Sequence, residues 1–204
     1  MDNKSHWEKV YETKSPGEVS WTQAVPRTSL NFIHSFNISR QAAIIDIGGG
    51  DSRLVDFLLE EDYENITVLD ISEKALQKAK ERLGKKSGKV KWIVSDITSF
   101  RPPTAYDVWH DRATFHFLTS REQVSHYLSI AGQSVSGYMA IGTFSTNGPQ
   151  KCSGLPIQQY DEKTLSAVFE NDFEKIKCIT EDHITPFNTT QNFLFCSFRK
   201  NKNN

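Results

Sequence analysis

The chain has 204 residues, of which 37% are hydrophobic and 24% are charged, a composition typical of a soluble globular protein. A chain of this length can build one sizeable core, so residues 1–204 are expected to form a single domain. The formal net charge of −1 at pH 7 gives no electrostatic reason to expect nucleic acid as a partner.

The N-terminal segment, residues 1–27, combines a short helical pattern with several large aromatic residues. Trp7, Val10 and Tyr11 have the i, i+3, i+4 spacing of an amphipathic helix, and a loop containing proline and glycine follows and reaches Trp21. These aromatic residues either pin the segment to the core or cover a binding site.

A short apolar strand that runs into three glycines organises the rest of the chain. Residues 43–47 read Ala-Ile-Ile-Asp-Ile and predict a buried parallel strand. Gly48, Gly49 and Gly50 permit a tight turn and the close approach of a ligand to bare backbone. A helical apolar pattern begins at Leu54, so strand, glycine turn and helix open a nucleotide-binding α/β unit.

Two further predicted strands lead into acidic residues. Residues 66–70 predict a strand that ends at Asp70, 20 residues beyond Gly50. A carboxylate at this distance can accept hydrogen bonds from both ribose hydroxyls of an adenosine. Residues 90–94 predict the next strand, and Asp96 follows it closely.

With these motifs the chain resembles the class I S-adenosylmethionine-dependent methyltransferases. Asp46 before the glycines is similar to that family's first motif, Asp70 to its ribose-binding acid, and Asp96 to the residue that meets the adenine amino group. The resemblance implies an α/β fold with a seven-stranded, mostly parallel sheet in the order 3-2-1-4-5-7-6, the last strand antiparallel, and helices on both faces. It also implies S-adenosylmethionine as cofactor, S-adenosylhomocysteine as product, and residues 1–27 as a lid. The cofactor-binding residues expected from it are Tyr11, Trp21, Asp46, Gly48, Gly49, Gly50, Asp70, Ile71, Asp96, Ile97 and His110.

A dinucleotide-binding oxidoreductase is the rival interpretation of the glycine turn. Gly48 and Gly50 fit a Gly-x-Gly-x-x-Gly fingerprint, but Arg53 occupies the position of the third glycine. Asp46 has no role beside a pyrophosphate, whereas a carboxylate there suits the ammonium group of a methionine moiety. The methyltransferase interpretation is therefore favoured.

The fourth predicted strand, residues 106–110, leads into a segment rich in ionisable side chains. In the resembling family the position of His110 lies close to the sulfonium and the incoming nucleophile, so His110 or Asp111 is a candidate general base. The alternative for Asp111 is an ion pair with Arg112 or a cap on the next turn, and the alternative for His116 is packing beside its aromatic neighbours. The spacing does not place both imidazoles on one helical face, so no metal is expected.

The C-terminal half supplies the remaining elements. The irregular segment 145–160 is long enough to be functional, and Tyr160 at its end is a candidate substrate-wall residue or second base. Residues 200–204 are expected to be a disordered tail. Helices are expected over 120–131 and 161–170, and strands over 137–144, 173–182 and 191–199.

Three cysteines without paired spacing indicate a reduced, intracellular protein rather than a disulfide framework. The N-terminus has no apolar signal core, and no segment is long enough to span a membrane. We therefore expect a cytoplasmic protein without a membrane partner, either a monomer or a weak homodimer.

The expected reaction is methyl transfer by in-line displacement, the chemistry of enzyme class EC 2.1.1. The near-neutral charge and the lack of an appended recognition domain favour a small-molecule acceptor. The asparagine-proline-proline-tyrosine signature that accompanies methylation of planar nitrogens is missing after the fourth strand. A protein side chain, most plausibly lysine, is the second hypothesis for the acceptor, and a sensor that binds the cofactor without turnover is the third interpretation.

Overall fold

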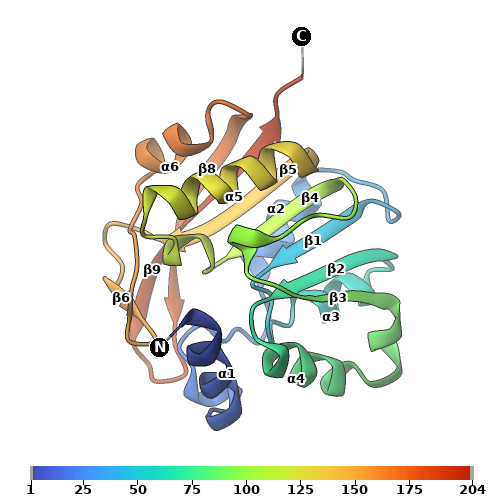
Figure 1. Cartoon of the computed structure of the whole chain (residues 1–204), viewed down its shortest axis with the longest axis vertical. Helices are drawn as coiled ribbons and strands as arrows, with labels where there is room; N and C mark the ends of the chain where they lie inside the picture. Colours follow the sequence, from blue (N-terminus) through green and yellow to red (C-terminus); the bar gives the residue numbers. More distant parts are fainter. Residues whose placement is uncertain (1, 203–204) are drawn as a thin grey trace.

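A seven-stranded sheet forms the centre of the computed structural model, which describes residues 2–202 (Figure 1). The strand order is β3-β2-β1-β4-β5-β9-β8; β1 to β5 are parallel, and β9 is antiparallel to both β5 and β8. Since β8 and β9 are the predicted sixth and seventh strands, the predicted order is confirmed. The strands of the sheet are β1 (Ala43–Ile47), β2 (Asn65–Asp70), β3 (Val90–Val94), β4 (Tyr106–Arg112), β5 (Val135–Phe144), β8 (Phe173–Ile184) and β9 (Thr190–Lys200).

Helices cover both faces of the sheet, as predicted. Alternate residues of a strand face opposite sides, so Ile45 packs in one core cluster with α5 and α6, and Ile44 in the other with α2 and α3. Between residues 2 and 202, no helix is both long and apolar enough to cross a bilayer. The α-helices are α1 (Asn3–Thr13), α2 (Arg27–Ser35), α3 (Leu54–Glu60), α4 (Glu73–Leu83), α5 (Arg121–Ser134) and α6 (Glu162–Phe169). Short 3₁₀ turns are η1 (Pro16–Glu18), η2 (Gly84–Lys89), η3 (Ile97–Ser99) and η4 (Phe115–Phe117).

The first helix, α1, is docked on the N-terminus of α4 by a carboxylate. Glu8 accepts hydrogen bonds from the backbone N–H groups of Glu73 (2.7 Å) and Lys74 (3.2 Å) and from the hydroxyl of Ser72 (3.1 Å). A carboxylate there satisfies N–H groups that have no partner within the helix and interacts favourably with the helix dipole. Figure 1 shows the resulting position of α1, beside α4 at one end of the sheet.

Two segments differ from the predicted elements. The segment 145–160, expected to be irregular, contains a small hairpin of β6 (Lys151–Cys152) and β7 (Leu155–Pro156). Lys200, expected in a disordered tail, is instead the last residue of β9, and its Nζ donates a hydrogen bond to the Gly132 carbonyl (2.6 Å). Residues 203–204 of that tail lie outside the described part of the chain.

A disulfide joins β8 and β9, so the expectation that the cysteines are reduced is wrong for one pair. Cys178 and Cys196 are register partners in the hairpin, with Cα atoms 4.1 Å apart and sulfur atoms bonded. The hairpin register brings them together, and linear spacing does not reveal that register. Cys152 is buried and free.

Candidate active site

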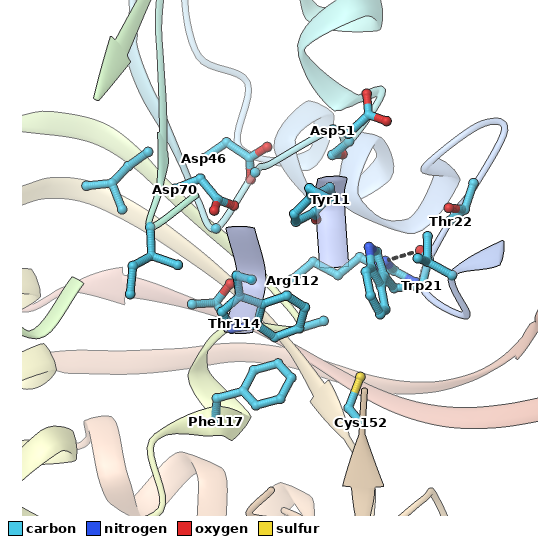
Figure 2. Close-up of a pocket in the computed structure, with 18 of the residues that line it drawn as sticks. Tyr11, Trp21, Thr22, Asp46, Asp51, Asp70, Arg112, Thr114, Phe117 and Cys152 are labelled. Carbon is cyan, nitrogen blue, oxygen red and sulfur yellow. Dashed lines mark hydrogen bonds between the residues drawn. The ribbon is translucent and has the colours of Figure 1, made fainter. Parts of the chain in front are cut away.

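A pocket of about 560 Å³ lies at the carboxyl ends of β1 to β4 (Figure 2). Its volume is usual for a small-molecule site, and ligands bind at the carboxyl ends of the strands in open α/β sheets. Side chains from α1 and from the loop of residues 14–24 form part of its wall. The N-terminal segment therefore covers one side of the pocket.

The turn after β1 requires glycine for two reasons. Gly48 has a φ of +62°, and a side chain there would collide with Oγ1 of Thr114. A Cβ on Gly49 would lie 2.6 Å from Oδ2 of Asp46. Gly48 and Gly49 lie on the pocket wall, and Gly50, with a φ of +47°, completes the turn beside it. The bare backbone leaves room for a ligand to contact it directly.

Three aspartates from successive strand ends come together on the pocket wall. Asp46 belongs to β1, Asp70 ends β2, and Asp96 follows β3 and caps η3. Burial raises the pKa of Asp70 to about 7, although a backbone N–H donates a hydrogen bond to its Oδ1 at 2.8 Å. Ile71 and Ile97 line the same part of the pocket.

His110 also lies on the wall, but both of its ring nitrogens are engaged. Nδ1 lies 2.7 Å from Oδ1 of Asp46, and Nε2 lies 2.8 Å from the hydroxyl oxygen of Ser29 on α2. Asp46 and His110 are register partners on neighbouring strands, which explains why their side chains meet. All three residues are buried, and the imidazole bridges the carboxylate and the hydroxyl, so each of these polar groups has a partner. This arrangement holds the Asp46 carboxylate in place.

The structure does not bring the other two catalytic candidates to the pocket. Asp111 points to the opposite face of the sheet, where it accepts hydrogen bonds from the Tyr127 hydroxyl (2.8 Å) and from the N–H groups of Thr114 and Phe115. Burial raises the pKa of Asp111 to about 6. Tyr160 is buried with its ring centre 5.5 Å from that of Phe115. Asp111 thus caps the turn after β4, which is one of the alternative roles that the sequence suggested for it. Tyr160 belongs to the core.

His116 likewise packs in the interior. Its ring centre lies 4.7 Å from the ring centre of Phe117 and 4.7 Å from that of Phe144. Burial lowers the pKa of His116 to about 3, so the ring is neutral. This is the packing role that the sequence suggested as its alternative.

Four aromatic rings line the pocket, and we call them the aromatic wall: Trp7, Tyr11, Trp21 and Phe117. The ring of Trp7 lies 5.6 Å from that of Trp21 and 5.2 Å from that of Phe117, measured between ring centres. Sequence reasoning singled out Tyr11 and Trp21 as cofactor-binding residues, considered Trp7 with them but favoured a role in pinning the segment to the core, and missed Phe117. The i, i+4 spacing of Trp7 and Tyr11 was the available signal, because it places both on one face of α1.

Comparisons with known proteins agree with this geometry. Residues 44–132 match a family model described as a methyltransferase domain. The mouse eEF1A lysine and N-terminal methyltransferase is 27% identical over 122 residues, 59% of this chain and 17% of that protein. The malonyl-[acyl-carrier protein] O-methyltransferase of Anoxybacillus flavithermus is 31% identical over 125 residues, 58% of this chain and 47% of that protein. The chain spans less than half the length of these curated relatives.

A solved structure extends the likeness over the whole fold. The N-methyltransferase NodS of Bradyrhizobium japonicum, in complex with S-adenosylhomocysteine, superposes with a TM-score of 0.74 at 13% identity. The match covers 98% of this chain and 100% of that chain. At this identity the likeness concerns the fold alone.

The pocket also fits S-adenosylmethionine, the methyl donor of the class I methyltransferases. Asp46 and Asp70 present carboxylates to a ligand that carries a sulfonium, an ammonium and two ribose hydroxyls. The glycine turn beside them is a cradle that a single Cβ would fill. Residues 44–132 match a methyltransferase domain, and the strand order and the strand-end acids agree with the fold of the class I, Rossmann-like S-adenosylmethionine-dependent methyltransferases, which the chain resembles.

Proposed function

We propose that this chain transfers the methyl group of S-adenosylmethionine to a small molecule. The observation that carries the proposal is the cover that the N-terminal segment places over the pocket. Trp7 packs on Phe117, so the lid is tied to the segment that follows β4. This packing favours an acceptor small enough to be enclosed together with the cofactor.

The strand-end residues have distinct proposed roles toward the cofactor. Asp70 would accept hydrogen bonds from the ribose hydroxyls, and Asp96 would accept one from the adenine amino group, with Ile71 and Ile97 beside the ring. Asp46, held by His110, would face the methionine ammonium. When bound, S-adenosylmethionine supplies a methyl group on a sulfonium, which is a good leaving group. Tyr11 and Trp21 would close the site from the lid.

The protein's contribution to the reaction is then placement of the acceptor and exclusion of water. The electron pair of the acceptor atom forms the new bond to the methyl carbon, while the bond from that carbon to sulfur breaks toward sulfur. Burial raises the pKa of the Cys152 thiol to about 12 and the pKa of the Tyr11 hydroxyl well above its ordinary value, so both stay protonated at neutral pH. His110 has no free ring nitrogen. We therefore propose an acceptor atom that is nucleophilic without a base, such as a thiolate or a carboxylate.

Two alternatives make different predictions. A protein lysine acceptor draws support from the name of the mouse relative, and a sensor would bind the cofactor without turnover. Incubation with methyl-labelled S-adenosylmethionine, in parallel with a metabolite extract and a protein lysate, separates the three. Label in a small-molecule product supports the proposal, and label in protein supports the lysine alternative. Binding of the cofactor without label in either sample would identify a sensor.

A further inference from the structure

Arg112 places a guanidinium on the pocket wall that has no carboxylate partner within residues 2–202. It is the last residue of β4, and Figure 2 shows it between Thr114 and Trp21. Nη1 donates a hydrogen bond to the Trp21 carbonyl (2.9 Å), and the guanidinium carbon lies 4.7 Å from the centre of the Phe193 ring. Nε and Nη2 are buried without a hydrogen-bond partner in the same part of the chain. The hydrogen-bonding capacity of Arg112 is therefore largely unused.

The surroundings of Arg112 do not neutralise its charge. Burial lowers the pKa of Arg112 to about 10, and the charge of Glu181 opposes this shift, but Arg112 and Glu181 form no ion pair. The Glu181 carboxylate instead accepts a hydrogen bond from Thr28. His116 and His183 carry pKa values lowered first by burial and also by Arg112, so both are neutral at pH 7. A covered cation without a counterion costs free energy, and a bound anion would offset that cost.

The other cations on the pocket wall are engaged or open to solvent. Arg82 forms ion pairs with two aspartates, and Lys78 donates a hydrogen bond to a backbone carbonyl (2.7 Å). Arg53 and Lys14 are exposed. Arg112 is thus set apart from them by its position at the tip of β4, next to the aromatic wall.

The strand ends on the pocket wall carry charges of opposite sign. The carboxylates of Asp46, Asp70 and Asp96 come from β1, β2 and the end of β3, where they suit the hydroxyls and positive groups of the cofactor. Arg112 comes from β4 and adjoins Trp21, whose carbonyl it binds. The part of the pocket that remains for the acceptor therefore combines a cation with aromatic surface.

Resting on the methyl transfer proposed above, we infer that the acceptor carries a carboxylate and that Arg112 binds it. The planar guanidinium matches the two oxygens of a carboxylate better than any other side chain does. Trp7, Trp21 and Phe117 would enclose the apolar body of this acid. An ammonium such as that of lysine would be disfavoured, because it would meet a like charge.

The charge of the acceptor is testable before its identity is known. A metabolite extract is separated at pH 7 on an anion exchanger, and the retained and unretained fractions are each incubated with the protein and methyl-labelled S-adenosylmethionine. We expect labelled product from the retained fraction alone, and phosphatase treatment of that fraction should not reduce it. Product from the unretained fraction, or its loss after phosphatase, would overturn the carboxylate inference and leave the methyl transfer standing. No product from either fraction, with S-adenosylhomocysteine binding intact, would overturn both.

Variants of Arg112 test the residue itself. Arg112→Gln should lower transfer from the retained fraction about 10- to 100-fold, the loss expected for a hydrogen-bonded charge pair. Its affinity for S-adenosylhomocysteine, measured by titration calorimetry, should not change. Arg112→Lys keeps the charge without the planar guanidinium, so its transfer rate should lie between those of the wild type and Arg112→Gln. This second variant keeps the test valid if Arg112→Gln does not fold. Arg199→Gln, which removes an exposed ion pair on β9, is the matched control and should behave as the wild type.

The same variants show whether Arg112 binds a carboxylate of the acceptor or the carboxylate of the cofactor. S-adenosylhomocysteine carries a carboxylate, whereas 5′-methylthioadenosine does not. If Arg112→Gln weakened binding of the first compound and left binding of the second unchanged, Arg112 would serve the cofactor and the inference would be overturned. We expect Arg112→Gln to bind each of the two compounds with the same affinity as the wild type does.

Discussion

Binding of the cofactor should depend on pH through one buried carboxylate. Asp70 is only 6% exposed, and burial raises its pKa to about 7 in the pocket without ligand. Ribose hydroxyls donate hydrogen bonds, so they stabilise the ionised form of this carboxylate. Binding of S-adenosylhomocysteine is therefore expected to release a proton wherever Asp70 is protonated beforehand.

The magnitude follows from the pKa. Below it, the ionised fraction of Asp70 falls tenfold for each unit of pH, so the affinity should be about tenfold weaker at pH 6 than at pH 8. The sign is that of an acid whose pKa is raised: affinity is fully present above about pH 8 and is lost as the pH falls through 7. At pH 7, about half a proton should be released for each molecule bound.

Titration calorimetry at pH 6, 7 and 8, in buffers of different ionisation enthalpy, measures both the affinity and the protons released. Asp70→Asn is the control, because it keeps the shape of the side chain and cannot ionise. This variant should bind about 10- to 100-fold more weakly at pH 8 and show no dependence on pH between 6 and 8. A wild-type affinity that is constant from pH 6 to 8, without proton release, would refute the assignment of Asp70. If the affinity of Asp70→Asn still depended on pH between 6 and 8, the ionising group would be another residue.

Three further substitutions separate the site from its supports. Gly48→Ala should abolish measurable S-adenosylhomocysteine binding and lower the free energy of unfolding by at least about 1 kcal/mol, because the positive φ and the clash with Thr114 both oppose a side chain. Binding of S-adenosylhomocysteine with wild-type affinity would contradict this prediction. Tyr127→Phe removes a hydrogen-bond donor from the buried Asp111 carboxylate, so the free energy of unfolding in urea should fall by about 1–3 kcal/mol while cofactor affinity stays unchanged. A loss of affinity would instead place Asp111 in the site. Glu8→Gln weakens the contact of α1 with the N-terminus of α4, so stopped-flow dissociation of S-adenosylhomocysteine should accelerate roughly 2- to 5-fold; an unchanged rate would mean that this contact does not hold the lid.

The sheet and the presence of strand-end acids at one edge of it could be predicted from the sequence because their signals are local. Each parallel strand is a short apolar run, and the residue that matters stands at or just after its end, as Asp70 and Asp96 do. The glycine turn is likewise contiguous with β1. Such signals need no knowledge of which strands are neighbours, because every parallel strand delivers its end to the same edge of the sheet.

Contacts between distant segments could not be predicted in this way. Glu8 docks on a helix terminus more than 60 residues away, and nothing near Glu8 in sequence indicates that partner. Cys178 and Cys196 are brought together by the register of a hairpin whose loop length does not fix it. In both cases the missing information is the relative position of two elements, which arises from packing of the whole chain.

The register of β4 decides the charge on both sides of the pocket. His110 and Arg112 are two residues apart and therefore share one face of the sheet, whereas Asp111 between them faces the core around Tyr127. Pairing of His110 with Asp46 across the strands sets which face is which. A shift of β4 by one residue would move His110 and Arg112 to the opposite face and Asp111 to the pocket face, because side chains alternate with a period of two. It would bury both basic side chains in the core and turn Asp111 toward Asp46, carboxylate against carboxylate, so the support for Asp46 and the cation offered to the acceptor depend on the same pairing.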